Sequence, residues 1–250
     1  MEVIFLGVGE ACDERNPNTS LLIYQKDTCL LLDCGFSVAH EFFKHEKDPN
    51  KPDIVWISHF HGDHFLGLPL LVLRLWEEGR EKPLYFIGQK GLSEKVTSAM
   101  KLAFPTLAEK ISFDYIFNEI HEDEKIEIKG ISFQGAYTEH VQSNLAIKLI
   151  CGEKSLYYSG DGPPSEKCYP LAGSCDLIVQ ETFLWDKDIY GHGNFLSAAQ
   201  FARKVGAKRL AAVHMKRDER DKIITLFEKN RDMFKEIEIY IPNSGDKITL

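Results

Sequence analysis

Residues 58–64, with the sequence SHFHGDH, constrain the fold more than any other stretch of the chain. They place three histidines and one aspartate within six positions. The apolar, β-branched run at residues 53–57 predicts a buried strand before them, and the longer apolar run at residues 65–76 predicts a buried helix after them. The polar cluster therefore lies in a strand-to-helix loop, where a rigid sheet commonly presents reactive side chains.

The spacing of this cluster points to metal binding. His59 and His61 are two positions apart, so both rings can face the same side of an extended segment, whereas Asp63 and His64 point elsewhere. One ion cannot comfortably take four ligands from six consecutive residues, but two neighbouring ions can share them, and Gly62 permits the tight backbone that this needs. Imidazole and carboxylate ligands suit zinc, with manganese or iron as alternatives.

Residues 59–64 resemble the HxHxDH signature of the metallo-β-lactamase superfamily. That pattern continues with a later histidine, a bridging aspartate and a final histidine, each at the end of a strand. His140, Asp161 and His214 follow in this order, each after an apolar run, so the resemblance covers nearly the whole chain.

The resemblance implies a hydrolase with two divalent metal ions, most simply Zn2+, and a bridging hydroxide as the nucleophile. Two such ions lower the pKa of a shared water molecule and polarise a phosphoryl or carbonyl oxygen. The resemblance implies that Asp63 is a catalytic residue as well as a metal ligand. The implied ligands of the first ion are His59, His61 and His140, those of the second are Asp63, His64 and His214, and Asp161 bridges the two.

The order of elements fits the fold that this resemblance implies. We expect one domain over residues 1–250, of the α/β (α+β) class, built as a four-layer αββα sandwich of the metallo-β-lactamase type. Helices are predicted at residues 36–46, 65–76, 90–104, 196–205 and 218–234. Strands are predicted at residues 2–6, 19–24, 28–33, 53–57, 83–88, 111–116, 125–128, 131–136, 144–149, 155–158, 175–180, 208–213, 236–241 and 247–250.

Further segments resemble the ribonuclease Z branch of the superfamily: residues 16–22, residues 31–35 and the sequence Glu181-Thr-Phe followed by Gly191-His192-Gly193-Asn194. In that branch the matching histidine is thought to help protonate the leaving oxygen, which makes His192 a candidate general acid. Glu181 either orients His192 or merely ends a strand. Asp33 either supports the metal loop or forms a turn or helix cap.

The chain departs from ribonuclease Z in one respect that bears on the substrate. Only about 20 residues separate His140 from Asp161, where ribonuclease Z usually carries a protruding tRNA-binding arm. The net charge of −8 also argues against a broad basic surface for nucleic acid. We therefore expect a small-molecule or nucleotide substrate, such as a cyclic nucleotide or short oligonucleotide, and not structured tRNA.

Three functional hypotheses stay open. The first is a phosphodiesterase, and the second is a hydrolase of a thioester, lactone, β-lactam or other ester or amide on the same fold, with tRNA 3′ processing as a further alternative. The third is a binding or scaffold protein, against which the complete ligand set argues. No apolar run is long enough for a membrane span, no signal peptide is evident, and six cysteines without a CxxC pair fit the cytoplasm. The sequence does not decide whether the chain forms a homodimer.

Overall fold

A computed structural model describes residues 1–107 and 109–250. Its strands are β1 (Glu2–Gly7), β2 (Ser20–Gln25), β3 (Thr28–Leu32), β4 (Ile54–Ile57), β5 (Leu84–Gly88), β6 (Tyr115–Glu119), β7 (Lys125–Ile128), β8 (Ile131–Tyr137), β9 (Leu145–Cys151), β10 (Lys154–Tyr158), β11 (Leu177–Glu181), β12 (Arg209–Val213), β13 (Glu238–Tyr240) and β14 (Lys247–Thr249). Its helices are α1 (Val38–His45), α2 (Gly62–Phe65), α3 (Leu68–Glu77), α4 (Leu92–Ala103), α5 (Cys168–Ala172), α6 (Phe195–Lys204), α7 (Arg220–Lys229) and the 3-10 helix η1 (Arg231–Phe234).

Within the described residues, the strands form two seven-stranded sheets with the orders β14-β1-β2-β3-β4-β5-β6 and β13-β12-β11-β10-β9-β8-β7. Alternate residues of both sheets meet in one apolar core, which includes Phe5 and Trp56 from the first sheet and Phe133 and Val179 from the second. Central strands such as β4 are buried on both faces, which explains why their sequences are continuously apolar.

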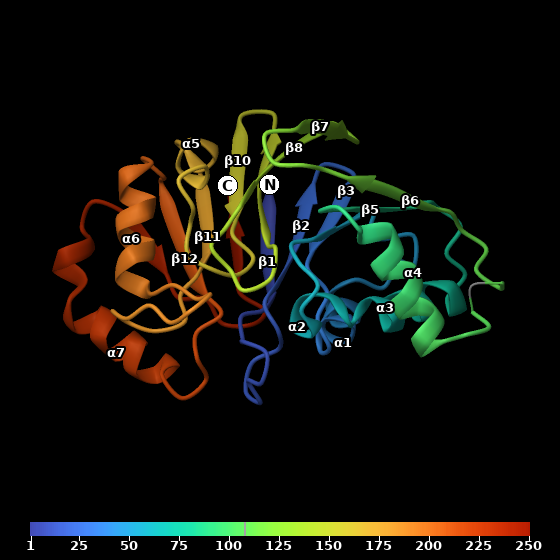
Figure 1. The fold of residues 1–250 in the computed structure, drawn as a ribbon, viewed down its shortest axis with the longest axis horizontal. Coiled ribbons are helices and arrows are strands. Elements are labelled where there is room, and N and C mark those ends of the chain that lie inside the picture. The colour runs from blue at the N-terminus through green and yellow to red at the C-terminus, as the bar shows by residue number, and fades with distance from the viewer. Residues whose placement is uncertain (108) are drawn as a thin grey trace.

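The helices cover the outer faces of the two sheets (Figure 1). Apolar residues of α1, α3 and α4 pack on the first sheet, among them Phe42 and Leu71. Residues of α5 and α6, such as Leu171 and Phe201, pack on the second sheet. The layers are therefore helix, sheet, sheet and helix, which confirms the predicted αββα sandwich.

Some element bounds differ from the sequence-based prediction. The predicted strand at 111–116 begins only at Tyr115, and the backbone N–H of Ile111 donates instead to Leu107 O. The predicted helix at 218–234 divides at Asn230, whose side chain donates to Leu226 O and so ends α7 before η1 begins. The predicted loop at 58–64 ends in a short helix, α2, the predicted helix at 65–76 begins only at Leu68 as α3, and the short α5 was not predicted.

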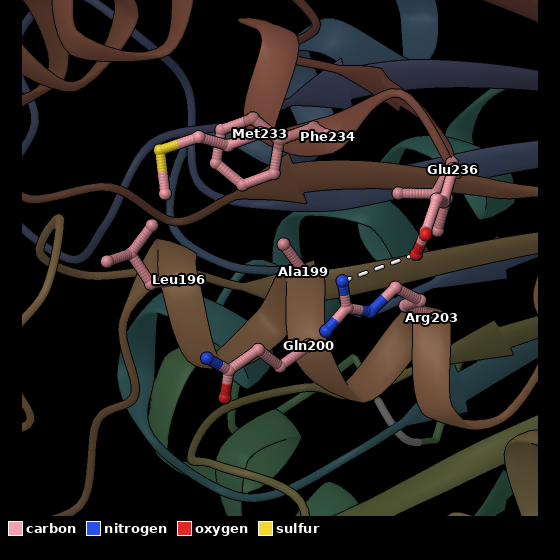
Figure 2. A pocket seen from close by; sticks show the side chains of 8 residues that line it. Leu196, Ala199, Gln200, Arg203, Met233, Phe234 and Glu236 are labelled. Carbon is pink, nitrogen blue, oxygen red and sulfur yellow. Dashed lines mark hydrogen bonds and ion pairs between the residues drawn. The ribbon is translucent and has the colours of Figure 1, made fainter. Parts of the chain in front are cut away.

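A small cavity of about 160 Å³ lies on the outer side of the second sheet, between α6 and the segment around η1. Figure 2 shows Leu196 and Met233 at this cavity, with the ion pair between Arg203 and Glu236 beside them. None of its lining residues is a candidate site residue, so the cavity belongs to helix packing. Across the described part of the chain, no helix is both long and apolar enough to cross a membrane.

Phe133→Ala is expected to lower the free energy of unfolding by about 3–5 kcal/mol, because this fully buried ring lies in the core between the two sheets. Urea denaturation followed by circular dichroism measures the change. Leu102→Ala is the control, since Leu102 on α4 is 86% exposed, and it should change the stability by less than about 0.5 kcal/mol. Equal effects of the two substitutions would contradict the position of Phe133 in the core.

Candidate metal centre

The candidate ligands gather where the carboxyl ends of several strands meet. In the first sheet β3 and β4 run parallel, and in the second sheet β10, β11 and β12 run parallel, so their ends lie at common edges. The 59–64 loop follows β4, His140 follows β8, Asp161 follows β10 and His214 follows β12. The two sheets thus contribute to one site from opposite sides.

All seven predicted ligand residues come together in two clusters that share one aspartate. Asp161 Oδ1 lies 3.2 Å from His64 Nε2 and 3.4 Å from His214 Nε2, while its Oδ2 lies 3.7 Å from His59 Nε2. The first cluster consists of His59, His61, His140 and Asp161. The second cluster consists of Asp63, His64, Asp161 and His214. The division is the one that the superfamily resemblance implies. Of the four other histidines, His40, His45 and His121 lie exposed, away from this site.

Hydrogen bonds on the outer nitrogen of three rings determine which nitrogen faces the site. His64 Nδ1 lies 2.7 Å from Asp33 Oδ2, and His140 Nδ1 lies 2.6 Å from Gly191 O. His59 Nδ1 lies 3.0 Å from Ser58 Oγ, whose own proton goes to Asp33. Each acceptor requires Nδ1 to carry the proton, which leaves the Nε2 lone pair free to bind a metal.

The buried polar atoms of the site fit metal ions. His59 Nε2 and Asp161 Oδ1 are buried without a hydrogen-bond partner, although such atoms are normally satisfied. His64 Nε2 and His214 Nε2 lie 3.4 Å apart, and His61 Nδ1 and His140 Nε2 lie 3.2 Å apart. Two ring nitrogens at such distances need a cation or a proton between them. The clusters can therefore bind divalent metal.

The electrostatics of the second cluster also favour positive charge. Burial by itself would lower the pKa of His214, but Asp161 and Asp63 outweigh it and raise that pKa to about 9. The pKa of His64 is raised in the same way against burial, by Asp161, Asp63 and Asp33. In the first cluster burial lowers the pKa of His59 well below its usual value, which keeps this ring neutral. A neutral ring is the form that binds a metal.

Asp33 supports the metal loop, which decides between the two interpretations of this residue. Its carboxylate is fully buried and accepts hydrogen bonds from Ser58 N (2.7 Å), Ser58 Oγ (2.7 Å) and Tyr158 Oη (2.6 Å), in addition to His64 Nδ1. Asp33 has φ of +58°, a left-handed conformation that is rare outside glycine and common at functional sites. Gly35 is required nearby, because a Cβ there would collide with Asp63 O.

Asn144 is a site residue that the sequence analysis missed. Its Nδ2 donates to Ser159 O (2.8 Å) and Asp161 O (2.9 Å), and its Oδ1 accepts from Asp161 N (3.1 Å). Asn144 Nδ2 also lies 2.7 Å from Thr138 Oγ1, so it joins the loop of Asp161 to the loop of His140. An asparagine at the start of a predicted strand carried no spacing signal that could reveal this role.

Glu181 and His192 form a pair at the edge of the ligand clusters. His192 Nδ1 lies 3.0 Å from Glu181 Oε1, and Glu181 Oε2 accepts from Gly193 N at 3.0 Å. Glu181 is fully buried at the end of β11, and burial raises its pKa. The His192 side chain is 21% exposed, and its ring stacks on that of Phe183 and lies nearly parallel to that of His214. Glu181 thus both ends a strand and contacts His192.

Comparison with known proteins places this geometry in a family context. The structure superposes on a metallo-beta-lactamase fold protein, YhfI from Bacillus subtilis, with a TM-score of 0.81 at 20% identity, covering 99% of both chains. It superposes on the short form of human tRNase Z (ELAC1) with the same TM-score and identity, covering 100% of this chain and 99% of the human chain. Ribonuclease Z of Sulfolobus acidocaldarius is 26% identical over 86% of this chain and 87% of its own length. The ribonuclease Z of Listeria welshimeri is 26% identical over 96% of this chain and 96% of its own length.

The fold and the two clusters define a ribonuclease Z-like, metal-dependent hydrolase of the metallo-β-lactamase superfamily. Within this class, the family model described as "Anti-Pycsar protein Apyc1" matches residues 1–229. The chain belongs to that family.

Asp33→Asn is expected to weaken metal binding by about 10–100-fold, because the amide has one acceptor oxygen and its NH2 would oppose the donors that now converge on the carboxylate. Competition with a chromogenic chelator measures the affinity. Asp53→Asn is the matched control: Asp53 is also buried, but it precedes β4 at the opposite end and bonds to Cys29 N and two lysines. Unchanged affinity in Asp33→Asn would show that this network does not orient the ligands.

Proposed function

We propose that this protein is a metal-dependent phosphodiesterase that acts on a nucleotide or another small phosphodiester. One observation carries the proposal: two ligand clusters share Asp161, and a third group of Glu181, His192 and His214 adjoins them. A site of this kind combines a metal centre with a partly exposed proton donor. Both features accelerate hydrolysis of an unactivated phosphodiester, the metal by supplying the nucleophile and the donor by protonating the leaving oxygen.

The proposed centre holds two divalent ions, with zinc as the preferred metal because imidazole and carboxylate ligands dominate. When bound, the ions would lower the pKa of a water molecule and polarise a phosphoryl oxygen. His59, His61 and His140 would hold one ion, Asp63, His64 and His214 the other, and Asp161 both. The protein's own contribution is the fixed orientation of these rings, which Asp33, Ser58 and Gly191 maintain from outside.

His192 is proposed to supply the proton that the leaving oxygen needs. Its Nδ1 is paired with Glu181, so the ring keeps Nε2 for the substrate. The buried carboxylate holds the ring by a hydrogen bond and would stabilise it when it is protonated. Because the ring also stacks on Phe183 and lies nearly parallel to that of His214, its position is fixed relative to the second ligand cluster.

The size of the substrate is inferred from what the chain lacks relative to ribonuclease Z. Strands β9 and β10 are joined by a tight turn at Gly152 and Glu153, so the described segment between His140 and Asp161 carries no protruding arm. The alignment with Listeria welshimeri ribonuclease Z spans 296 positions against 250 residues here, so the relative carries insertions that this chain does not have. A cyclic nucleotide or short oligonucleotide suits the smaller surface.

Processing of tRNA 3′ ends is the second candidate, because curated relatives matching 86–96% of this chain are named ribonuclease Z. A panel of metal-saturated assays separates the hypotheses: cyclic and short linear nucleotides, a precursor tRNA, and thioester, lactone and β-lactam substrates. We expect turnover of the nucleotides, and no efficient 3′ trimming of the precursor. Efficient trimming by this chain alone would favour the second candidate, and turnover confined to carboxylic substrates would exclude both.

Protein reloaded after chelation is expected to bind two ions per chain by elemental analysis. Asp161→Ala should bind fewer ions and lose hydrolytic activity, because Asp161 belongs to both clusters, and His61→Ala should lose activity as well. Circular dichroism should show that both variants remain folded. His121→Ala is the control, since this exposed histidine lies outside both clusters and should keep full metal content. A saturating stoichiometry of one in the unmodified protein would overturn the dinuclear proposal.

His192→Ala is expected to slow hydrolysis of a nucleotide phosphodiester by about 10²–10⁴-fold, because a nucleoside leaving group needs a proton in the transition state. An activated aryl phosphodiester leaves as a stable phenolate, so its kcat should stay within about tenfold. Metal content should not change. His45→Ala, at an exposed position on α1, serves as the control. Equal losses on both substrates would indicate that His192 positions the substrate instead of protonating it.

A further inference from the structure

A tight turn beside the metal centre carries an exposed aromatic side chain that the proposed chemistry does not use. The turn is closed by two backbone hydrogen bonds between Ile189 and His192, of 3.2 Å and 2.9 Å. Gly191 has φ of +83° at its tip, and its carbonyl binds the Nδ1 of the candidate ligand His140 at 2.6 Å. The position of Tyr190 is therefore tied to both His140 and His192.

The Tyr190 side chain lies almost wholly in solvent. Its exposed fraction is 89%, and its neighbours Ile189 and Val141 are 43% and 51% exposed. Val141 faces Gly191 across the turn, because a Cβ on Gly191 would meet the Val141 side chain. Clustered exposed apolar groups of this kind commonly mark a binding surface. Here they form an apolar rim at the mouth of the site.

This rim borders a pocket of about 450 Å³ that adjoins the metal centre, since His140 lines the pocket and also belongs to the first ligand cluster. Glu139 and Asp188 contribute carboxylates to it, and Pro163 and Ile189 contribute apolar surface. Among the described residues that line it, there is no lysine or arginine. The pocket therefore disfavours a phosphate group and accepts an uncharged ring, whereas a phosphodiester would lie at the neighbouring cation site.

We propose that Tyr190 stacks on the nucleobase of the substrate, with the base in this pocket and the phosphodiester at the metal centre. The proposal rests on the proposed function, which it deepens by assigning a residue that selects nucleotides over other phosphodiesters. Stacking on an aromatic ring is tolerant of base identity, because every base has a π-face. The turn holds the backbone of Tyr190 beside the pocket, so binding of the base has to order only the side chain.

Two chromogenic substrates with the same leaving group test this assignment: thymidine 5′-(p-nitrophenyl) phosphate and methyl p-nitrophenyl phosphate. Tyr190→Ala should lower the ratio of their kcat/KM values by about 5- to 150-fold, the range expected for one base–aromatic stack. Tyr190→Phe and Tyr190→Trp should preserve the ratio, because stacking needs the ring and not the hydroxyl. Leu102→Ala, at an exposed site on α4, is the surface control. An unchanged ratio in Tyr190→Ala would overturn the proposal.

A binding experiment separates this proposal from the proposed function. Calorimetry on metal-loaded protein compares thymidine 5′-monophosphate with ribose 5-phosphate, which lacks the base. We expect the nucleotide to bind more tightly, and Tyr190→Ala to remove most of that difference. The same outcome in a protein that hydrolyses neither chromogenic ester would support the base site while refuting the phosphodiesterase. Equal affinity of the two ligands for the unmodified protein would refute the base site.

Discussion

The buried carboxylate of Asp33 joins the parts of the molecule on which the metal centre depends. Its oxygens accept from the backbone and hydroxyl of Ser58 after β4, from the ring of His64 in α2, and from the hydroxyl of Tyr158 at the end of β10. The first two positions belong to one sheet and its loop, and the third to the other sheet. A buried charge is tolerated only when its hydrogen bonds are made, so the carboxylate holds these elements at fixed separations.

This single group orients one ligand in each cluster. It binds His64 directly, and it reaches His59 through the hydroxyl of Ser58, which donates to Asp33 and accepts from the ring. In both rings the outer nitrogen is therefore protonated and the inner nitrogen is free. Support of this kind raises ligand basicity and removes ring rotation, which is why outer contacts affect metal affinity almost as much as the ligands do.

The sequence was sufficient to predict which candidate ligands come together, because their spacing is local or follows strand ends. The 59–64 loop carries four of the seven candidate ligands, and the αββα fold brings His140, Asp161 and His214 to it as the resemblance implied. The residues that hold the ligands from outside the clusters were harder to predict from the sequence. Asp33 could equally have capped a turn. The role of Tyr158 depends on how the two sheets face each other, and that of Asn144 on how the loops after β8 and β10 meet, which no short-range pattern encodes. The division of the final helix at Asn230 likewise depends on one side-chain contact with Leu226 O.

The charge of the chain bears on the kind of substrate that is proposed for the metal centre. The chain has a net charge of −8, and the pocket beside His140 adds the carboxylates of Glu139 and Asp188 near the site. A long polyanion such as tRNA needs a cationic surface that neutralises many phosphates. A small phosphodiester carries one negative charge, which a dication pair at the clusters can balance locally. An acidic surface would repel the remaining phosphates of a long nucleic acid but not an uncharged base, so the charge distribution supports the proposed small substrate and the proposed base site beside Tyr190.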